Sequence, residues 1–173
     1  KPELVAHGAG GTSQAAAVVS GIALLVQQSY QIKHGSLPPA SLVKAALINS
    51  ADEVGSPGPD FVSGYGNADA LGALRSIQAQ QFKLDAVATG QSRTFQLKVP
   101  AGVQRLKATL VWHDPEAEPN AEQALINDLD LVLRHTTSGK TWRPWVLSTY
   151  PHPDSLQRPA RRKIDRLNNV EQI

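Results

Sequence analysis

The hydrophobic residues change their spacing near residue 80, and this change constrains the fold more than any other feature of the sequence. Before it, the chain is rich in alanine and carries apolar residues at helical spacing. After it, apolar and polar residues alternate in short runs. A period near 3.6 predicts helices and a period of two predicts strands. We therefore expect a helical part over residues 1–79 and an antiparallel β part over residues 80–173.

Three helices are expected in the first part. Apolar residues surround the first helix on every side from Ala15 to Val26, which predicts a buried helix that needs a parallel sheet beside it. Gly35 suits the left-handed residue that ends such a helix. The expected ranges are Thr12 or Ser13 to about Ile32, Leu42 to about Ala51, and a short helix capped by Asn67 that ends near Ile77.

Short strands separated by turns are expected in the second part. Pro100–Gly102 reads as a turn, and Thr137–Lys140 reads as a hairpin turn that leads to Thr141 and Trp142. The expected strands are residues 82–86, 94–99, 106–112 and 129–133. Several short strands with turns between them are typical of an antiparallel sandwich or jelly roll.

Composition excludes several classes of function. The chain has 17 Lys and Arg against 15 Asp and Glu, and this small excess does not indicate nucleic-acid binding. The dense basic cluster of Arg158, Arg161, Arg162, Lys163 and Arg166 is interpreted as a solvated loop. No cysteine is present, which excludes thiolate zinc sites and disulfides. It also fits a secreted or bacterial cell-envelope protein. The apolar run at 15–26 is too short to span a membrane.

Gly10–Ala16 is the segment with the clearest chemical meaning. It places Ser13 after two glycines at the start of a helix, where backbone N–H groups are free and the helix dipole is positive. Both features favour an oxyanion that forms beside the serine. The alternative is that Thr12 or Ser13 only caps the helix.

The same segment resembles the subtilisin-like serine proteases, known as subtilases or peptidase family S8. Around Ser13 the resemblance rests on Lys1–Ala6, Gly11-Thr12-Ser13-x-Ala15 and Gly21; further on it rests on Leu42–Ile48 and Gly64–Ala68. The second part is similar to the β-sandwich domain appended to some bacterial alkaline subtilases, through Leu110–Asp114, Leu125–Val132 and Asn168–Glu171.

This resemblance implies an α/β catalytic domain whose last helices occupy residues 1–79, followed by an incomplete β-sandwich over 80–173. It also implies a Ser-His-Asp triad that cleaves protein or peptide substrates without a required cofactor. Ser13 would be the nucleophile, and its own N–H would donate a hydrogen bond to the oxyanion. Gly11 and Thr12 would support the nucleophile and this N–H. The histidine, aspartate and oxyanion asparagine are expected upstream in the same protease, so this chain alone is expected to be inactive.

Three departures from the family pattern are visible. The stretch before Gly11 is compressed to residues 7–10, Ala17 stands where the family has proline, and His7 stands where it has another proline. The compression reflects either residues missing from the sequence or a true loop deletion. Ala17 keeps the helix intact, and a direct base role for His7 is not favoured.

Metal sites are weakly indicated. His34, His113, His135 and His152 show no ligand spacing, which argues against zinc. Asp128 and Asp130 alternate on one strand and are candidates for structural calcium, because calcium prefers oxygen ligands. A polar, solvent-facing strand edge or a turn contact is the favoured interpretation.

Two rival functions remain open. The first alternative to a protease is an inactive subtilase-like scaffold. The second is an interaction module in which the sandwich binds a partner and Ser13 is only a helix cap.

Overall fold

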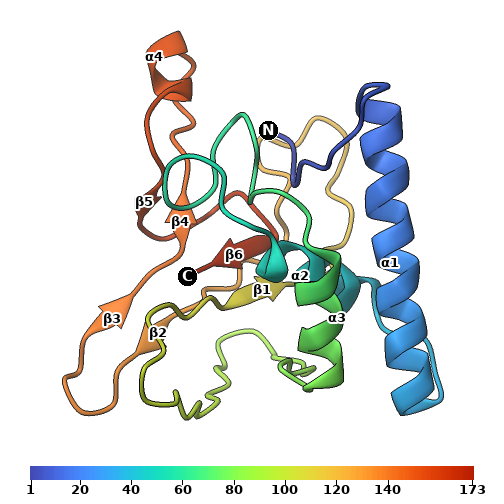
Figure 1. The fold of residues 1–173 in the computed structure, drawn as a ribbon. Coiled ribbons are helices and arrows are strands. Elements are labelled where there is room, and N and C mark those ends of the chain that lie inside the picture. The colour runs from blue at the N-terminus through green and yellow to red at the C-terminus, as the bar shows by residue number, and fades with distance from the viewer.

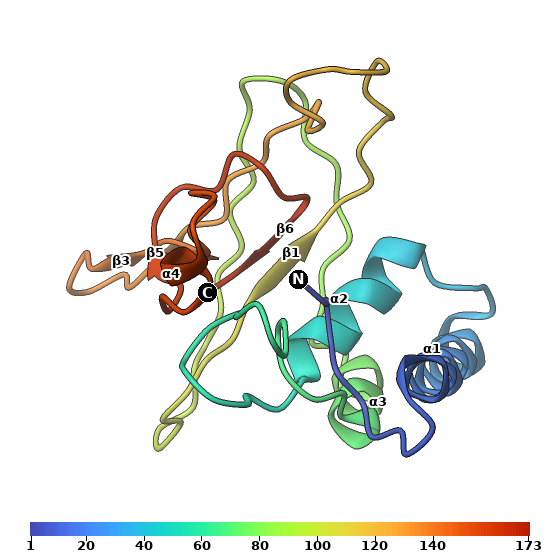
Figure 2. The ribbon, with the colours of Figure 1, turned by 90° about the horizontal axis from the view of Figure 1, so that it is seen from above.

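The computed structural model describes residues 1–173, with the longer helices on one side and the small sheets and a short helix on the other (Figure 1). The elements are α1 (Thr12–His34), α2 (Ala40–Ser50), α3 (Ala70–Gln78), β1 (Thr109–Val111), β2 (Leu133–Arg134), β3 (Thr141–Trp142), β4 (Trp145–Val146), α4 (Pro153–Leu156), β5 (Arg161–Arg162) and β6 (Val170–Gln172). Viewed from above, α2 and α3 lie between α1 and the β1–β6 pair (Figure 2). The mixture of helices and small antiparallel sheets is compatible with part of an α/β protein.

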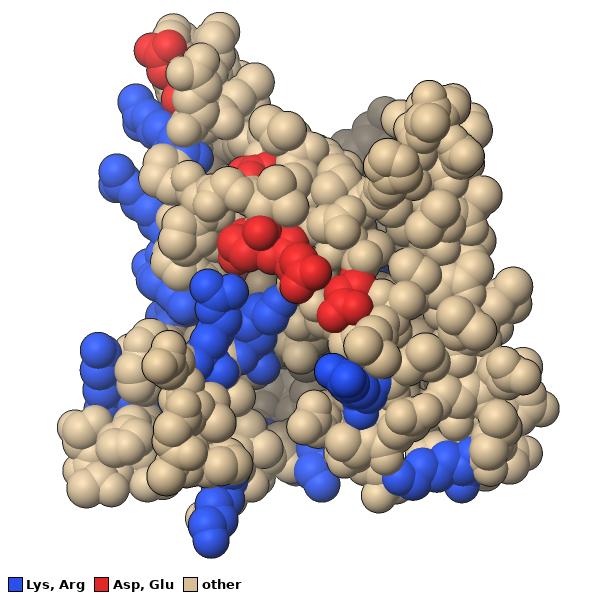
Figure 3. All heavy atoms as spheres, in the orientation of Figure 1, with Lys and Arg blue, Asp and Glu red and all other residues tan.

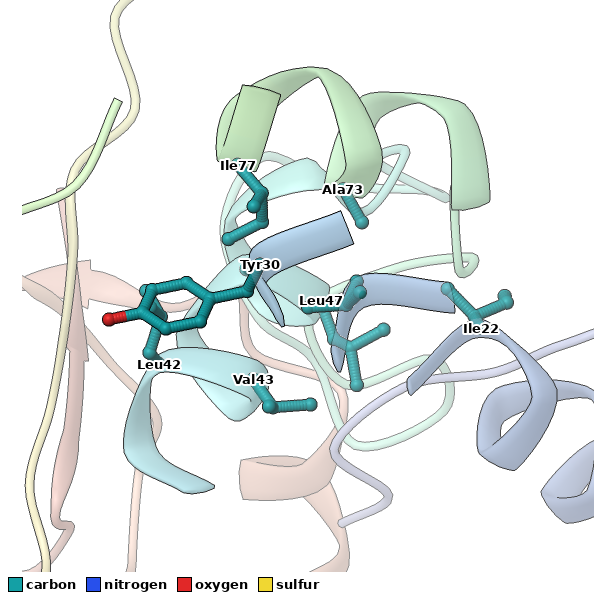
Figure 4. Packing of buried hydrophobic residues seen from close by; sticks show 9 residues of the cluster. Ile22, Tyr30, Leu42, Val43, Leu47, Ala73 and Ile77 are labelled. Atoms are coloured by element: carbon teal, nitrogen blue, oxygen red, sulfur yellow. The ribbon is translucent and has the colours of Figure 1, made fainter. Parts of the chain in front are cut away.

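The core lies where α1, α2 and α3 meet (Figure 4). Ile22, Val26 and Tyr30 form a stripe on α1 because residues four apart share one face of a helix. They pack against buried residues of the other two helices, namely Leu42, Val43, Ala46, Leu47, Ala73 and Ile77. These contacts fix the position of α1 and the direction of its axis.

The ends of the helices follow local signals in two of the three cases. α1 ends at Gly35, which has φ +72° and donates its N–H to the Gln31 carbonyl, as predicted. α2 begins and ends within two residues of its expected range. The predicted cap of α3 was wrong: Asp69 stands at the N-cap position. Asn67 is instead held by backbone hydrogen bonds with Asp52, each donating to the other at 2.8 Å.

Parallel strand pairing is present only as a single bridge, between Val5 and Asn67. Val5 donates its N–H to the Gly66 carbonyl at 3.0 Å, and Ala68 donates to the Val5 carbonyl at 2.8 Å. The short segment before α1 is thereby tied to the segment before α3.

The outer face of α1 is exposed, which corrects the expectation of a helix buried on every side. Leu24 is 65% exposed and Ile32 is 81% exposed. The reason is that α2 and α3 cover only one stripe of the helix. The run at 15–26 was expected to be too short to span a membrane, but the whole of α1 is long and apolar enough to do so by length and composition, since no charged residue precedes Lys33 within the helix. A signal sequence and the core helix of a soluble protein pass the same test. The contacts of Ile22 and Val26 are those of a core helix.

The second part forms three two-stranded antiparallel sheets: β1 with β6, β2 with β3, and β4 with β5. The β2–β3 hairpin confirms the turn expected at Thr137–Lys140. The turn at Pro100–Gly102 is also confirmed, since Val103 donates its N–H to the Pro100 carbonyl. The strands expected at 82–86 and 94–99 were wrong, because these segments have no ladder partner. Closure into a jelly-roll sandwich stays a prediction.

The β1–β6 pair connects the two parts of the chain. Thr109 Oγ1 donates to Asn49 Oδ1 at 2.9 Å, and Lys107 Nζ donates to the Ala51 carbonyl at 2.6 Å. Gln172 Nε2 reaches the Ile48 carbonyl from the other strand. The end of α2 is therefore anchored on β1 and β6, while the boundary near residue 79 stays a prediction.

Candidate active site

Ser13 is the second residue of α1 and is exposed to solvent. The N–H groups of Gln14 and Ala15 both donate to the Gly11 carbonyl at 3.2 Å, whereas those of Thr12 and Ser13 have no acceptor. No acidic residue lies in the first turn of the helix. A hydroxyl thus stands beside unoccupied N–H donors at the positive end of a helix dipole. This arrangement suits an oxyanion that forms on a group attached to the serine oxygen.

Gly11 is the N-cap of α1, and no side-chain hydrogen bond caps the helix. Its φ of +92° lies in the region that only glycine adopts readily. Neither Thr12 nor Ser13 therefore acts as the cap that the simpler interpretation proposed. The hydroxyl of Ser13 is left without a structural task at the helix start.

The turn before the helix is held by two contacts that sequence reasoning missed. A Cβ on Gly8 would lie 2.8 Å from the Ala15 nitrogen, so only glycine fits there. Gln14 Oε1 accepts the N–H of Gly10 at 2.6 Å. A glutamine at the third helical position is a sequence signal for a contact of this kind, since in a capping box it reaches back to the N–H of the N-cap residue. Here it reaches one residue further, to Gly10.

A groove of about 1000 Å³ runs beside this turn. Its walls are mostly apolar and come from the segment before α1, from the first turns of α1, and from α2. Gly11 and Thr12 lie on its wall, as do Ala16 and Val43. The groove shows that the start of α1 is open on this side.

No histidine is hydrogen-bonded to Ser13. His7 is exposed and makes no side-chain hydrogen bond. His34 stacks on Tyr30 at the far end of α1, with ring centroids 4.2 Å apart. His135 bonds to Ser138, and His152 accepts the Asp154 N–H as the cap of α4. The chain therefore brings the candidate nucleophile and its donors together but supplies no base beside them.

The calcium candidates are paired with arginines. Asp128 accepts a hydrogen bond from Arg166, and Asp130 lies 4.0 Å from Arg143. The structure contains no group of three or more side chains placed to hold a metal ion. A calcium role for Asp128 and Asp130 stays a prediction, and their arginine partners supply the charge that calcium would bring.

Glu171 is a titratable group that the sequence did not indicate. Its side chain is only 1% exposed in β6, although the Leu131 N–H donates to its Oε2. Burial raises the pKa of Glu171 to about 7, against the effect of that hydrogen bond and with help from the nearby carboxylates of Asp130, Asp165 and Asp128. It lies in the β part and forms no contact with the start of α1, so we regard it as a determinant of stability.

Comparison with known proteins bears directly on the Ser13 segment. Residues 5–66 match the subtilase family, peptidase S8. This subtilase segment contains Ser13, all of α1 and α2, and the turn at Gly64. The expected resemblance to subtilases is therefore confirmed for these residues, while the appended sandwich domain lies outside the match.

A curated relative extends the similarity beyond the subtilase segment. The chain is 31% identical over 185 aligned residues to the Dictyostelium discoideum protein named serine protease/ABC transporter B family protein tagA. The alignment covers 94% of this chain and 10% of the relative. The chain thus spans about a tenth of the length of the curated relative that it matches. A peptidase family and a relative named as a serine protease agree with the geometry at Ser13.

Proposed function

We propose that this chain carries the nucleophile of a subtilisin-like serine endopeptidase, with Ser13 as that nucleophile. The observation that carries the proposal is an exposed serine beside unoccupied N–H donors, inside the segment that matches the subtilase family. The name of the Dictyostelium relative supports the same activity.

In the proposed reaction, Ser13 Oγ attacks the carbonyl carbon of a peptide bond while a base takes its proton. The carbonyl oxygen becomes an oxyanion, which accepts a hydrogen bond from the Ser13 N–H at the start of α1. The base gives this proton to the amine as the peptide C–N bond breaks, which leaves the acyl-enzyme. Water then attacks the acyl-enzyme while the base takes a proton from it, and the base returns that proton to Ser13 Oγ as the acid product leaves. No cofactor is needed. The base, its aspartate and the second oxyanion donor come from another part of the longer protein, since no histidine here reaches Ser13.

Activation of the serine explains why the 173-residue chain is proposed to be inactive by itself. A serine hydroxyl is a weak nucleophile at neutral pH unless a base lies within hydrogen-bond reach. We also propose that the protease acts outside the cytoplasm, in keeping with the absence of cysteine.

Labelling with a fluorophosphonate probe tests this function, because the probe reacts only with an activated serine. The full-length protein should be labelled, its Ser13→Ala variant should not, and the 173-residue chain should not. Ser20→Ala is the matched control, since Ser20 is an exposed serine of the same helix that bonds to the Ala16 carbonyl. Labelling that survives Ser13→Ala would refute the nucleophile, and a full-length protein that is never labelled would favour the inactive scaffold.

A further inference from the structure

The positive charge of the chain is concentrated in one region, which we name the basic arm and define as residues 134–166. It contains eight Lys and Arg residues against two Asp and Glu, whereas the rest of the chain contains nine against 13. The basic arm therefore has a formal charge of +6 and the remainder has −4. Figure 3 shows the blue side chains gathered along the side where Figure 1 draws β3, β4 and β5. All eight cations are exposed: Arg134, Lys140, Arg143, Arg158, Arg161, Arg162, Lys163 and Arg166.

Few of these charges are neutralised within the chain. Arg166 pairs with Asp128, and Arg143 lies at the 4.0 Å limit of an ion pair with Asp130. Of the two acidic residues in the arm, Asp165 is buried and its carboxylate accepts hydrogen bonds from its own loop. The other, Asp154, is exposed and lies beside His152, so eight exposed cations face one exposed carboxylate in the basic arm.

The basic arm contains a short strand, β5, with an open edge. β5 pairs only with β4. Lys163 donates its N–H to the Pro144 carbonyl at 3.1 Å, so the next pair along the ladder, Arg162 opposite Trp145, is the non-hydrogen-bonded one. In an antiparallel ladder the N–H and C=O of such a residue point away from the partner strand. Arg162 therefore offers a donor and an acceptor at the open edge of β5.

Cations lie on both faces of this edge strand. Successive side chains of a strand point to opposite faces, so Arg161 and Lys163 lie on one face and Arg162 lies on the other. A flat anionic membrane needs its cations on one face together with an apolar patch. An extended chain running along the edge meets cations on both faces. The distribution of charge therefore favours a strand-like ligand over a lipid surface.

The aromatic residues of the basic arm argue against single-stranded nucleic acid. Such ligands need exposed rings on which bases stack. Trp145 is covered by the Arg162 guanidinium at 3.9 Å and sits against Gly58, and Trp142 lies under Lys140 at 5.1 Å. Both rings are only partly exposed. They hold cations in place and leave little ring surface for a base.

We propose that the open edge of β5 is a docking site for an extended acidic peptide segment of a partner protein. The peptide would add a strand through the outward N–H and C=O of Arg162, and its carboxylates would meet Arg161 and Lys163 on one face and Arg162 on the other. Strand addition gives affinity through the main chain, and side-chain charge gives selectivity. The same cations repel a second copy of β5, which restricts the edge to ligands of opposite charge. This site is separate from Ser13 and goes beyond the proposed protease activity.

Binding of a fluorescent peptide to the full chain tests the proposal. The probe is a peptide of about ten residues in which Glu and Thr alternate, and the readout is fluorescence anisotropy. We expect saturable binding that weakens as salt is raised, because the contacts are exposed charges. The double variant Arg161→Gln, Lys163→Gln should weaken binding about tenfold. Lys83→Gln, Lys98→Gln is the matched control, since it removes two exposed lysines outside the basic arm and should leave the affinity unchanged.

Altered ligands separate the two parts of the proposal. A peptide with Gln in place of Glu should bind at least about tenfold more weakly, and methylation of alternate backbone nitrogens should abolish strand addition. Equal binding of the methylated peptide would overturn docking at the strand edge. If the control pair Lys83→Gln, Lys98→Gln weakened binding as much as Arg161→Gln, Lys163→Gln, the assignment of the site to β5 would be overturned. Tighter binding of single-stranded oligothymidylate, or of vesicles of equal phosphatidylserine and phosphatidylcholine, would replace the acidic peptide with that ligand.

Discussion

Replacing Glu171 with glutamine is expected to stabilise the protein at alkaline pH. The side chain is 1% exposed, its Oε2 accepts the Leu131 N–H, and its Oε1 has no hydrogen-bond partner. An ionised carboxylate in such a place costs free energy because burial removes its hydration. Glutamine keeps the shape and the acceptor for Leu131 but never carries the charge.

The size of the effect follows from the pKa. Burial raises the pKa of Glu171 from its ordinary 4.5 to about 7, so the folded state holds the proton more tightly than the unfolded state. The free energy of unfolding should therefore fall as pH rises from about 4.5 to about 7, and it should stay level above that. This difference in pKa between the folded and unfolded states corresponds to about 3 kcal/mol in the free energy of unfolding. Glu171→Gln should lose this part of the pH dependence and should be up to about 3 kcal/mol more stable than wild type at pH 8.

Urea denaturation followed by tryptophan fluorescence measures this difference at about pH 5 and about pH 8. Groups with lowered pKa values, such as Asp60 and Asp114, finish titrating at more acidic pH and cancel in the comparison with wild type. Glu118→Gln is the control, because Glu118 is exposed and should change stability by less than about 0.5 kcal/mol at either pH. The buried-carboxylate argument would be refuted if Glu171→Gln were less stable than wild type at pH 8. It would also be refuted if the variant changed the free energy of unfolding by the same amount at both pH values.

Three further predictions use the same denaturation measurement. Ile77→Ala should lower the free energy of unfolding by about 3 kcal/mol because Ile77 is 1% exposed. Ile32→Ala should change it by less than about 0.5 kcal/mol because Ile32 is 81% exposed. Similar losses of stability in the two variants would contradict the described core. Gly11→Ala should cost about 1–2 kcal/mol through its positive φ, while Gly21→Ala, in the middle of α1 with open space around it, should stabilise by about 1 kcal/mol. Ser13→Ala should change stability by less than about 0.5 kcal/mol, and a loss of about 1 kcal/mol would mean that Ser13 caps the helix after all.

Features that depend on neighbours in the sequence were predictable. The start of α1 follows from a glycine pair before an apolar run, and its end follows from Gly35, whose left-handed backbone was expected. The exposure of Ser13 also follows from its place in the first turn. Each of these features is decided within a few residues, so local propensity and capping determine it.

Features that depend on distant residues were not predictable from the sequence. Asn67 looked like a helix cap, yet its backbone bonds to Asp52, and the cap position passes to Asp69. The alternation over residues 82–99 describes two faces but does not name a partner strand, and in this chain none is present. The burial of Glu171 arises from the pairing of β1 with β6, which joins residues about 60 positions apart. Long-range pairing of this kind leaves no local signature.

α1 joins the core to the proposed chemistry, but its two ends are held by different interactions. The first buried residue of the helix is Ile22, which lies nine residues after Ser13, a distance of about 14 Å along a helix axis. Nearer to Ser13, the helix start is held by the close approach of Gly8 to Ala15 and by the hydrogen bond from Gly10 to Gln14. Loss of core packing should therefore lower stability while leaving the first turn intact in the molecules that remain folded. A bulky residue at position 8 should do the reverse, because it displaces Ser13 without opening the core. Stability and placement of the nucleophile are thus separable properties of this one helix.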